Sequence, residues 1–413
     1  MIDLTAMARA FLALLVAGLS GCSSSSAEPQ VIDDPYAGGA SFPTPAPIAV
    51  PAGPIAMVSN NGSDTISFLD LTTHTPFADV PVGIDPVGLD GPHHLAFDPA
   101  KREIFVALAY PAPAFSPGPH AEHGSSTLPG KVMRLGFPSM SVLGVARVDE
   151  NPGDIVISED GSRVVVTHFD LKKALANPGN PDKQRARLLS FDAKTIGAAD
   201  APAPVAVDVC VAPHGVVLSR PDGRYAYVAC YGEDALAVVD LADPAHPVTR
   251  TPVGPDPGPP GAPQYGPYAI ALSEDGSTVA IGNTLKRDLR MFDAKTGALL
   301  AGKTYPAQGA VMFPVFLGGT LYVPVQTPDM VVRLDVQATT FEITKRALTK
   351  DECVLPHEIQ LGAAPGEVLL VCEGDHKAPS VVLALDGTSL ATTARMNVGA
   401  YPDRLVVAKG GAQ

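Results

Sequence analysis

The chain has 413 residues, with 43 acidic and 29 basic side chains and a formal net charge of −14. No cluster of Lys and Arg interrupts this negative charge. That argues against nucleic acid or an anionic membrane surface as a partner, because both are bound through a basic face. Tryptophan is absent, and 39 Gly and 42 Pro punctuate the chain. This composition favours one large β-rich domain over two smaller domains.

The beginning of the chain has the parts of a secretory signal. Its apolar run, residues 10–17, is too short to span a bilayer, which needs about 20 apolar residues. Small residues follow and end at Cys22. This ending resembles the bacterial lipobox, which implies cleavage before Cys22 and a lipid on that cysteine. A start at Met7 in place of Met1 would give the signal its usual basic first segment, so we expect Met7 to be the true start.

Four segments are expected along the chain. Residues 1–21 form the lipoprotein signal peptide, and residues 22–53 form a flexible tether rich in Ser, Pro and Ala. Residues 54–409 form the folded domain, and residues 410–413 are a tail. The anchor predicts a location in the cell envelope, at the outer membrane facing the periplasm or the cell surface. A secreted protein with an incidental cysteine is the alternative.

The folded domain contains a repeat. Seven times the chain shows an apolar strand, a turn, a second apolar strand, a polar loop and a third strand. Some turns have the Asp-Gly signal of hairpins, as at Asp160-Gly161 and Asp222-Gly223. The third strands end at Asp70, Gly136, Asp192, Asp240, Asp293, Asp335 and Asp386. A weaker fourth strand follows each of them. This pattern predicts an all-β, seven-bladed β-propeller of four-stranded antiparallel blades.

Ring closure can also be predicted. The domain starts at a second strand and ends with a lone first strand, residues 402–408. We therefore expect the C-terminal strand to pair with the N-terminal blade, which removes a free sheet edge.

The repeats resemble those of the YVTN-repeat propeller family across residues 53–409. The segment Val58-Ser-Asn-Asn-Gly-Ser-Asp-Thr-Ile-Ser-Phe-Leu-Asp70 is close to that family's repeat, and Tyr225-Ala-Tyr-Val-Ala-Cys230 is a second good copy. The resemblance implies the same propeller fold.

The first residues of the innermost strands define the mouth of the central channel. Three of these positions hold histidine, and a further histidine ends a second strand on the same face. The candidate ligand-binding residues at the mouth are His93, His168, His214, Tyr268, His357 and Asp403. By strand alternation, His94 should point away from the channel if His93 faces it.

A metal site is one interpretation of these histidines. Convergent imidazoles from His93, His214 and His357 would suit copper or zinc. The alternative is that Pro-His simply begins a strand well, with each ring bonded to backbone carbonyls.

Four cysteines follow Cys22 and allow three disulfide connectivities. Only Cys210 with Cys230, and Cys353 with Cys372, would stay within one blade. In an oxidising compartment we expect these pairs to be disulfides. Two Cys/His metal sites are the alternative.

Function is less clearly indicated. The sequence lacks a covalent haem motif, a zinc-protease helix, a serine nucleophile elbow and a phosphate-binding glycine loop. The leading prediction is therefore a non-enzymatic binding or protein-interaction module, which presents its loop-rich channel mouth to a protein or a small molecule. The alternatives are a copper- or zinc-binding or redox protein, and a lactonase-like hydrolase.

Overall fold

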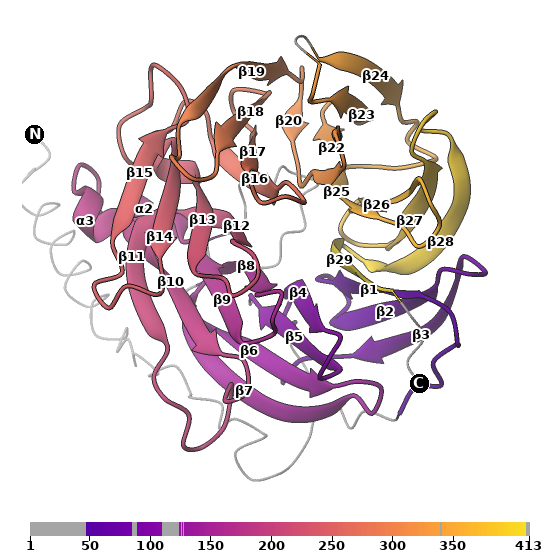
Figure 1. The fold of residues 1–413 in the computed structure, drawn as a ribbon. Coiled ribbons are helices and arrows are strands. Elements are labelled where there is room, and N and C mark those ends of the chain that lie inside the picture. Colours follow the sequence, from indigo (N-terminus) through magenta and orange to yellow (C-terminus); the bar gives the residue numbers. More distant parts are fainter. Residues whose placement is uncertain are drawn as a thin grey trace, which may run out of the picture. The chain divides into compact units, whose positions relative to one another are not determined.

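The computed structural model describes residues 47–84, 89–109, 124, 126, 128–338 and 341–409, except for the side chain of Glu342. Seven antiparallel sheets surround a common centre (Figure 1), so the prediction of an all-β, seven-bladed propeller is confirmed. Among these residues, no helix is long and apolar enough to cross a membrane. The expected signal peptide, Cys22 and the tail lie outside the described residues.

The sheets are numbered as blades 1 to 7, and their strands are given from the centre outward. Blade 1 consists of β29 (Pro402–Ala408), β1 (Ile55–Asn60), β2 (Thr65–Asp70) and β3 (Thr75–Pro81). Blade 2 consists of β4 (Pro92–Asp98), β5 (Glu103–Leu108), β6 (Pro129–Gly136) and β7 (Ser141–Glu150). Blade 3 consists of β8 (Pro152–Ile157), β9 (Arg163–His168), β10 (Arg185–Asp192) and β11 (Val205–Val211). Two short helices, α2 (Leu171–Ala176) and α3 (Pro181–Gln184), lie between β9 and β10.

The remaining blades follow the same order. Blade 4 consists of β12 (Pro213–Leu218), β13 (Tyr225–Cys230), β14 (Ala235–Asp240) and β15 (Val248–Pro252), with the 3₁₀ turn η2 (Tyr231–Glu233) after β13. Blade 5 consists of β16 (Pro267–Leu272), β17 (Thr278–Asn283), β18 (Asp288–Asp293) and β19 (Leu299–Pro306). Blade 6 has a broken inner strand, β20 (Ala310–Val311) and β21 (Val315–Leu317), followed by β22 (Thr320–Gln326), β23 (Met330–Asp335) and β24 (Glu342–Ala347). Blade 7 consists of β25 (Pro356–Leu361), β26 (Glu367–Cys372), β27 (Pro379–Asp386) and β28 (Thr392–Ala400).

The last strand closes the ring as expected. β29 pairs with β1 in an antiparallel ladder that runs from Ile55 opposite Ala408 to Val58 opposite Leu405. In Figure 1 the yellow β29 lies beside the indigo β1. The first blade is thus built from both ends of the folded domain, and β1 has no free edge.

The core lies between the blades. All six residues of β1 are buried, as are all six of β5, because both faces of these strands are covered by neighbouring blades. The outermost strands, such as β7, include exposed positions. The recurring Asp at the end of the third strand has a local role. In β2, for example, the Asp70 carboxylate accepts a hydrogen bond from the Thr72 N–H and thereby shapes the turn.

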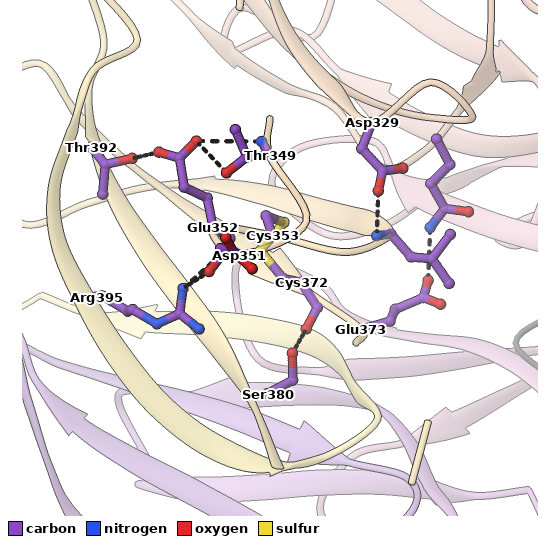
Figure 2. The surroundings of a disulfide bond; sticks show 12 residues. Asp329, Thr349, Asp351, Glu352, Cys353, Cys372, Glu373, Ser380, Thr392 and Arg395 are labelled. Carbon is purple, nitrogen blue, oxygen red and sulfur yellow. Dashed lines mark hydrogen bonds between the residues drawn. A yellow bond between two sulfur atoms is a disulfide. The ribbon is translucent and has the colours of Figure 1, made fainter. Parts of the chain in front are cut away.

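Both expected disulfides are present: Cys210–Cys230 and Cys353–Cys372. Figure 2 shows the second of these, which joins the segment before β25 to the end of β26. The Cys210–Cys230 bond does not stay within one blade. Cys210 lies on β11, the outermost strand of blade 3, and Cys230 ends β13 of blade 4. The sequence prediction of an intra-blade bond was wrong here because β11 passes into β12 after a single residue, which hides the blade boundary.

Candidate active site at the centre of the propeller

The innermost strands begin with an irregular backbone. The register between β4 and β5 shifts between Pro92 and Leu95, and similar shifts occur at the starts of β8, β12, β16 and β25. A bulge breaks the alternation of side chains between the two faces. As a result, the rings of His93 and His94 lie together, with centroids 4.3 Å apart. The expectation that His94 points away from the channel was therefore wrong.

Asp403, on β29, is the centre of a group that we call the Asp403 cluster: His93, His94, His357 and Asp403. The His93 Nδ1–H donates to Asp403 Oδ2. His357 Nδ1 lies 2.8 Å from Asp403 Oδ1 and 2.9 Å from the Asp403 carbonyl oxygen. His94 Nε2 lies 3.7 Å from Oδ1. All four side chains are at most 1% exposed. The cluster joins strands of blades 1, 2 and 7.

A second buried carboxylate, Asp154 on β8, holds the other side of His94. The His94 Nδ1–H donates to Asp154 Oδ1 over 2.7 Å. Asp154 Oδ2 accepts from the Val216 N–H at 3.0 Å, and Oδ1 also accepts from the Ile155 N–H. Asp154 is thus fixed by backbone donors from blades 3 and 4, and it fixes the orientation of the His94 ring.

An ion pair between the partly buried Arg404 and the buried Glu358 lies beside the cluster. Arg404 Nη1 is 3.1 Å from Glu358 Oε1, and the Leu405 N–H donates to Glu358 Oε2. The Arg404 guanidinium also lies over the Phe313 ring, 5.6 Å from its centroid. Burial opposes the charge on Arg404, but the carboxylates of Glu358 and Asp154 raise its pKa. The guanidinium is therefore a permanent positive charge at the centre of the propeller.

Two predicted mouth residues form an aromatic group next to the cluster. His214 stacks on Tyr268 with ring centroids 3.7 Å apart, and Phe169 and Phe313 lie edge-on or tilted to them. The rings of His93 and His214 are 5.7 Å apart. The structure thus brings His93, His214, Tyr268, His357 and Asp403 together.

His168 bonds to its own blade and not to the Asp403 cluster among the residues that the structure describes. Its Nδ1–H donates to the carbonyl oxygen of Arg187 on β10 at 2.7 Å, within blade 3. Burial lowers the pKa of His168, and the bond to Arg187 opposes this only in part. Of the six residues predicted at the mouth, this one does not contact the Asp403 cluster in the part of the chain that the structure describes.

Electrostatic coupling decides the charges in the cluster. Burial alone would disfavour a charged His94, but the carboxylates of Asp154 and Asp403 outweigh it and raise the pKa of His94. Burial likewise opposes the charge on His357, yet Asp403 raises the pKa of His357 to about 9. In the other direction, burial disfavours the Asp403 carboxylate, but His93 and His357 bring its pKa well below the usual value. Asp403 is therefore ionised at neutral pH.

The residues placed closely enough to bind a metal ion differ from the three histidines predicted from the sequence. Within the described residues, one ligand atom each of His93, His94 and Asp403 lie within 4.8 Å of one another. Only His93 belongs also to the set His93, His214 and His357 named from the sequence. The sequence missed His94 because the bulge that turns it inward has no signature in a single strand.

Comparisons with known proteins show the fold. No family model matches the sequence, and neither does a curated protein sequence. The periplasmic gluconolactonase of Pseudomonas aeruginosa is similar in structure, with a TM-score of 0.63 and 18% identity over 86% of this chain and 99% of that one. A putative 6-phosphogluconolactonase from Bacteroides uniformis has a TM-score of 0.62 and 12% identity over 87% of this chain and 100% of the other. A putative 6-phosphogluconolactonase from Bacteroides fragilis has a TM-score of 0.57 and 13% identity over 87% of this chain and 98% of the other.

These comparisons correct the leading functional prediction. The chain was expected to be a non-enzymatic binding module because it lacks a catalytic motif. That expectation is wrong, since propellers of this architecture include proteins described as lactonases. The physical reason is that side chains at the centre of a propeller come from different blades. Such a site leaves no compact motif in the sequence.

Proposed function

We propose that the protein is a hydrolase that opens a cyclic ester, a lactone, at the centre of its propeller. The observation that carries the proposal is the buried pair of Asp403 and His93, in which an ionised carboxylate accepts the Nδ1–H of an imidazole. This is the arrangement by which many hydrolases orient a general base. The lactonase descriptions of proteins with the same fold support it.

His93 is the proposed base. With its Nδ1 proton directed at Asp403, the ring is held in the tautomer whose Nε2 can accept a proton. Water adds to the carbonyl carbon of the lactone while its proton passes to Nε2. The bond between that carbon and the ring oxygen then breaks, and the ring oxygen takes the proton from the imidazolium. The product is an open-chain hydroxy acid, and the base is regenerated.

Arg404 is the proposed electrostatic partner. The carbonyl oxygen gains negative charge when water adds, and a fixed cation in a buried site stabilises such charge far more than it would in water. The pair with Glu358 holds the guanidinium in place. The rings of Tyr268, Phe169 and Phe313 add an aromatic wall beside the cluster. Because His93 and Asp403 are buried, the proposal requires the channel mouth to open when a lactone binds.

The test is a panel of lactones. Sugar-derived lactones, their phosphorylated forms and simple γ- and δ-lactones are incubated with the protein, and acid release is followed above the spontaneous rate. We expect turnover with at least one class, and a loss of about 10²- to 10⁴-fold for His93→Ala, the usual contribution of a general base. His168→Gln is the matched control, because it changes a buried histidine outside the cluster. No acceleration across the panel, or full activity in His93→Ala, would contradict the proposal.

We also propose that the protein belongs to the YVTN-repeat type and is held at the cell envelope by a lipid on Cys22, with the propeller facing the periplasm or the cell surface. The lipobox-like sequence supports this location. Mass spectrometry of the mature N-terminal peptide tests the lipid directly. A Cys22→Ala variant should leave the membrane fraction, and a variant that stays there would contradict the anchor.

A further inference from the structure

His94 has two nitrogens in different surroundings. Nδ1 is bonded to Asp154, whereas Nε2 is buried and has no hydrogen-bond partner among the described residues. The atom nearest to it in the cluster is Asp403 Oδ1, at 3.7 Å. That distance is too long for a hydrogen bond. It is, however, the separation expected for two ligands of one ion, because metal–ligand bonds of about 2.0–2.2 Å place neighbouring ligands about 3–4 Å apart.

We propose that His93, His94 and Asp403 bind one divalent transition-metal ion of the zinc or copper class. Two imidazoles and a carboxylate are ligands that suit such ions, while calcium and magnesium prefer oxygen alone. The candidate ligand atoms of the three residues already lie within 4.8 Å of one another, so a small inward shift completes the set. Three protein ligands leave a coordination position for water or a substrate.

Asp154 supports this assignment from the second layer of contacts. A metal-bound histidine usually donates its other ring N–H to a carboxylate, which fixes the ring and strengthens its basicity. Asp154 does this for His94, and Asp154 is itself held by the N–H groups of Val216 and Ile155. The direction of the His94 ring is therefore set by the fold, with Nε2 on the side of Asp403.

The charges around the site also favour a cation. Three carboxylates are buried in this region, Asp154, Glu358 and Asp403. Arg404 pairs with Glu358, and His357, whose pKa is raised to about 9, is a second cation beside Asp403. Uncompensated negative charge is costly in a buried site. A divalent ion between His94 and Asp403 would offset the one carboxylate charge that these two cations leave unbalanced.

The test measures metal and not turnover. The protein is purified without a histidine tag, stripped with a chelator, loaded with zinc and dialysed, and its metal content is determined by mass spectrometry. Cobalt gives a second readout, because Co²⁺ in a site of this kind absorbs visible light. We expect one ion per chain, and its loss in His94→Gln and Asp403→Asn. His168→Gln should bind as the unchanged protein does.

Asp154→Asn keeps all three ligands, so it tests the site even if the ligand variants fail to fold. It should bind zinc about 10- to 100-fold more weakly, the usual effect of removing such a supporting carboxylate. Circular dichroism shows whether each variant is folded. The proposal is overturned if the folded protein retains no stoichiometric metal, or if His94→Gln and Asp154→Asn bind as tightly as the unchanged protein.

The metal site shares His93 and Asp403 with the proposed hydrolase but does not depend on that activity. A His93 nitrogen bound to the ion cannot also take a proton, so the general-base role of His93 belongs to the metal-free protein. Metal content is measured without substrate, so a failure of every lactone leaves the metal result intact. Conversely, lactone hydrolysis by the stripped protein would support the hydrolase even if no ion binds.

Discussion

Arg404 on β29 and Glu358 on β25 form an ion pair, with 3.1 Å between Nη1 and Oε1, across the junction of the first and last blades; Glu358 is buried and Arg404 is partly buried. Glu358 also accepts the N–H of Leu405 from β29. The junction is therefore held by charge as well as by the ladder between β29 and β1. The same contacts bring Asp403 next to His357. Ring closure and the central site therefore both depend on β29, which supplies residues to each.

Removing the guanidinium should weaken this junction. Arg404→Met leaves the Glu358 carboxylate buried without its cation, which typically costs about 3–5 kcal/mol of unfolding free energy. Adding Glu358→Gln should recover part of that loss, because the amide carries no charge. Urea unfolding of the two single variants and the double variant measures the coupling. Arg224→Met, which breaks the exposed pair with Asp240, is the control and should change little. Equal effects of Arg404→Met and Arg224→Met would contradict the role of the pair.

The two disulfides should contribute similarly to stability. They close loops of 20 and 19 residues, for which the chain-entropy model gives about 3 kcal/mol each. We expect replacing both members of either pair by serine to lower the urea midpoint to a similar extent. The Cys210–Cys230 bond links blade 3 to blade 4, so its loss should also speed hydrogen exchange in β11 and β13. Protected exchange in both strands after its removal would show that the blades hold without it.

Asp234 organises a long loop after β15. Its two carboxylate oxygens accept from the N–H groups of Gly258, Gln264, Tyr265 and Gly266, at 2.7–2.9 Å. Asp234→Asn keeps one oxygen acceptor and replaces the other with a donor, which leaves backbone N–H groups without their partner. Hydrogen bonds to a charged group contribute about 1.5–3 kcal/mol each, so a loss of several kcal/mol is expected in urea unfolding. An unchanged midpoint would mean that water replaces the carboxylate.

The parts of the fold that repeat could be predicted from the sequence. Seven copies of one strand pattern outweighed the irregularities of any single copy, and the lone strand at residues 402–408 indicated closure. The partners across blades could not be predicted in this way. The pairing of His94 with Asp154 depends on a backbone bulge, and the crossing of Cys210 into the next blade depends on a connection of one residue. Neither the His94–Asp154 contact nor the Cys210–Cys230 bond leaves a pattern in the nearby sequence, because each depends on how two blades pack together.

His168 should make the stability of the protein depend on pH. Burial lowers its pKa in the folded state below the ordinary value of 6.5, despite the bond to Arg187 and the nearby carboxylates of Asp149 and Glu150. Between the folded pKa and 6.5, the unfolded chain binds more protons than the folded chain at this residue. Its contribution to stability is therefore lost as pH falls through 6.5.

In His168→Gln the residue cannot titrate, and the amide can still donate to the Arg187 carbonyl. We expect unfolding free energy to fall less between about pH 7 and about pH 5 in this variant than in the unchanged protein. Urea unfolding at several pH values measures both slopes, and the difference between them isolates His168 from the other titrating groups. Parallel slopes would mean that the histidine stays accessible to protons in the folded state, and its burial between β9 and β10 would then have no electrostatic consequence.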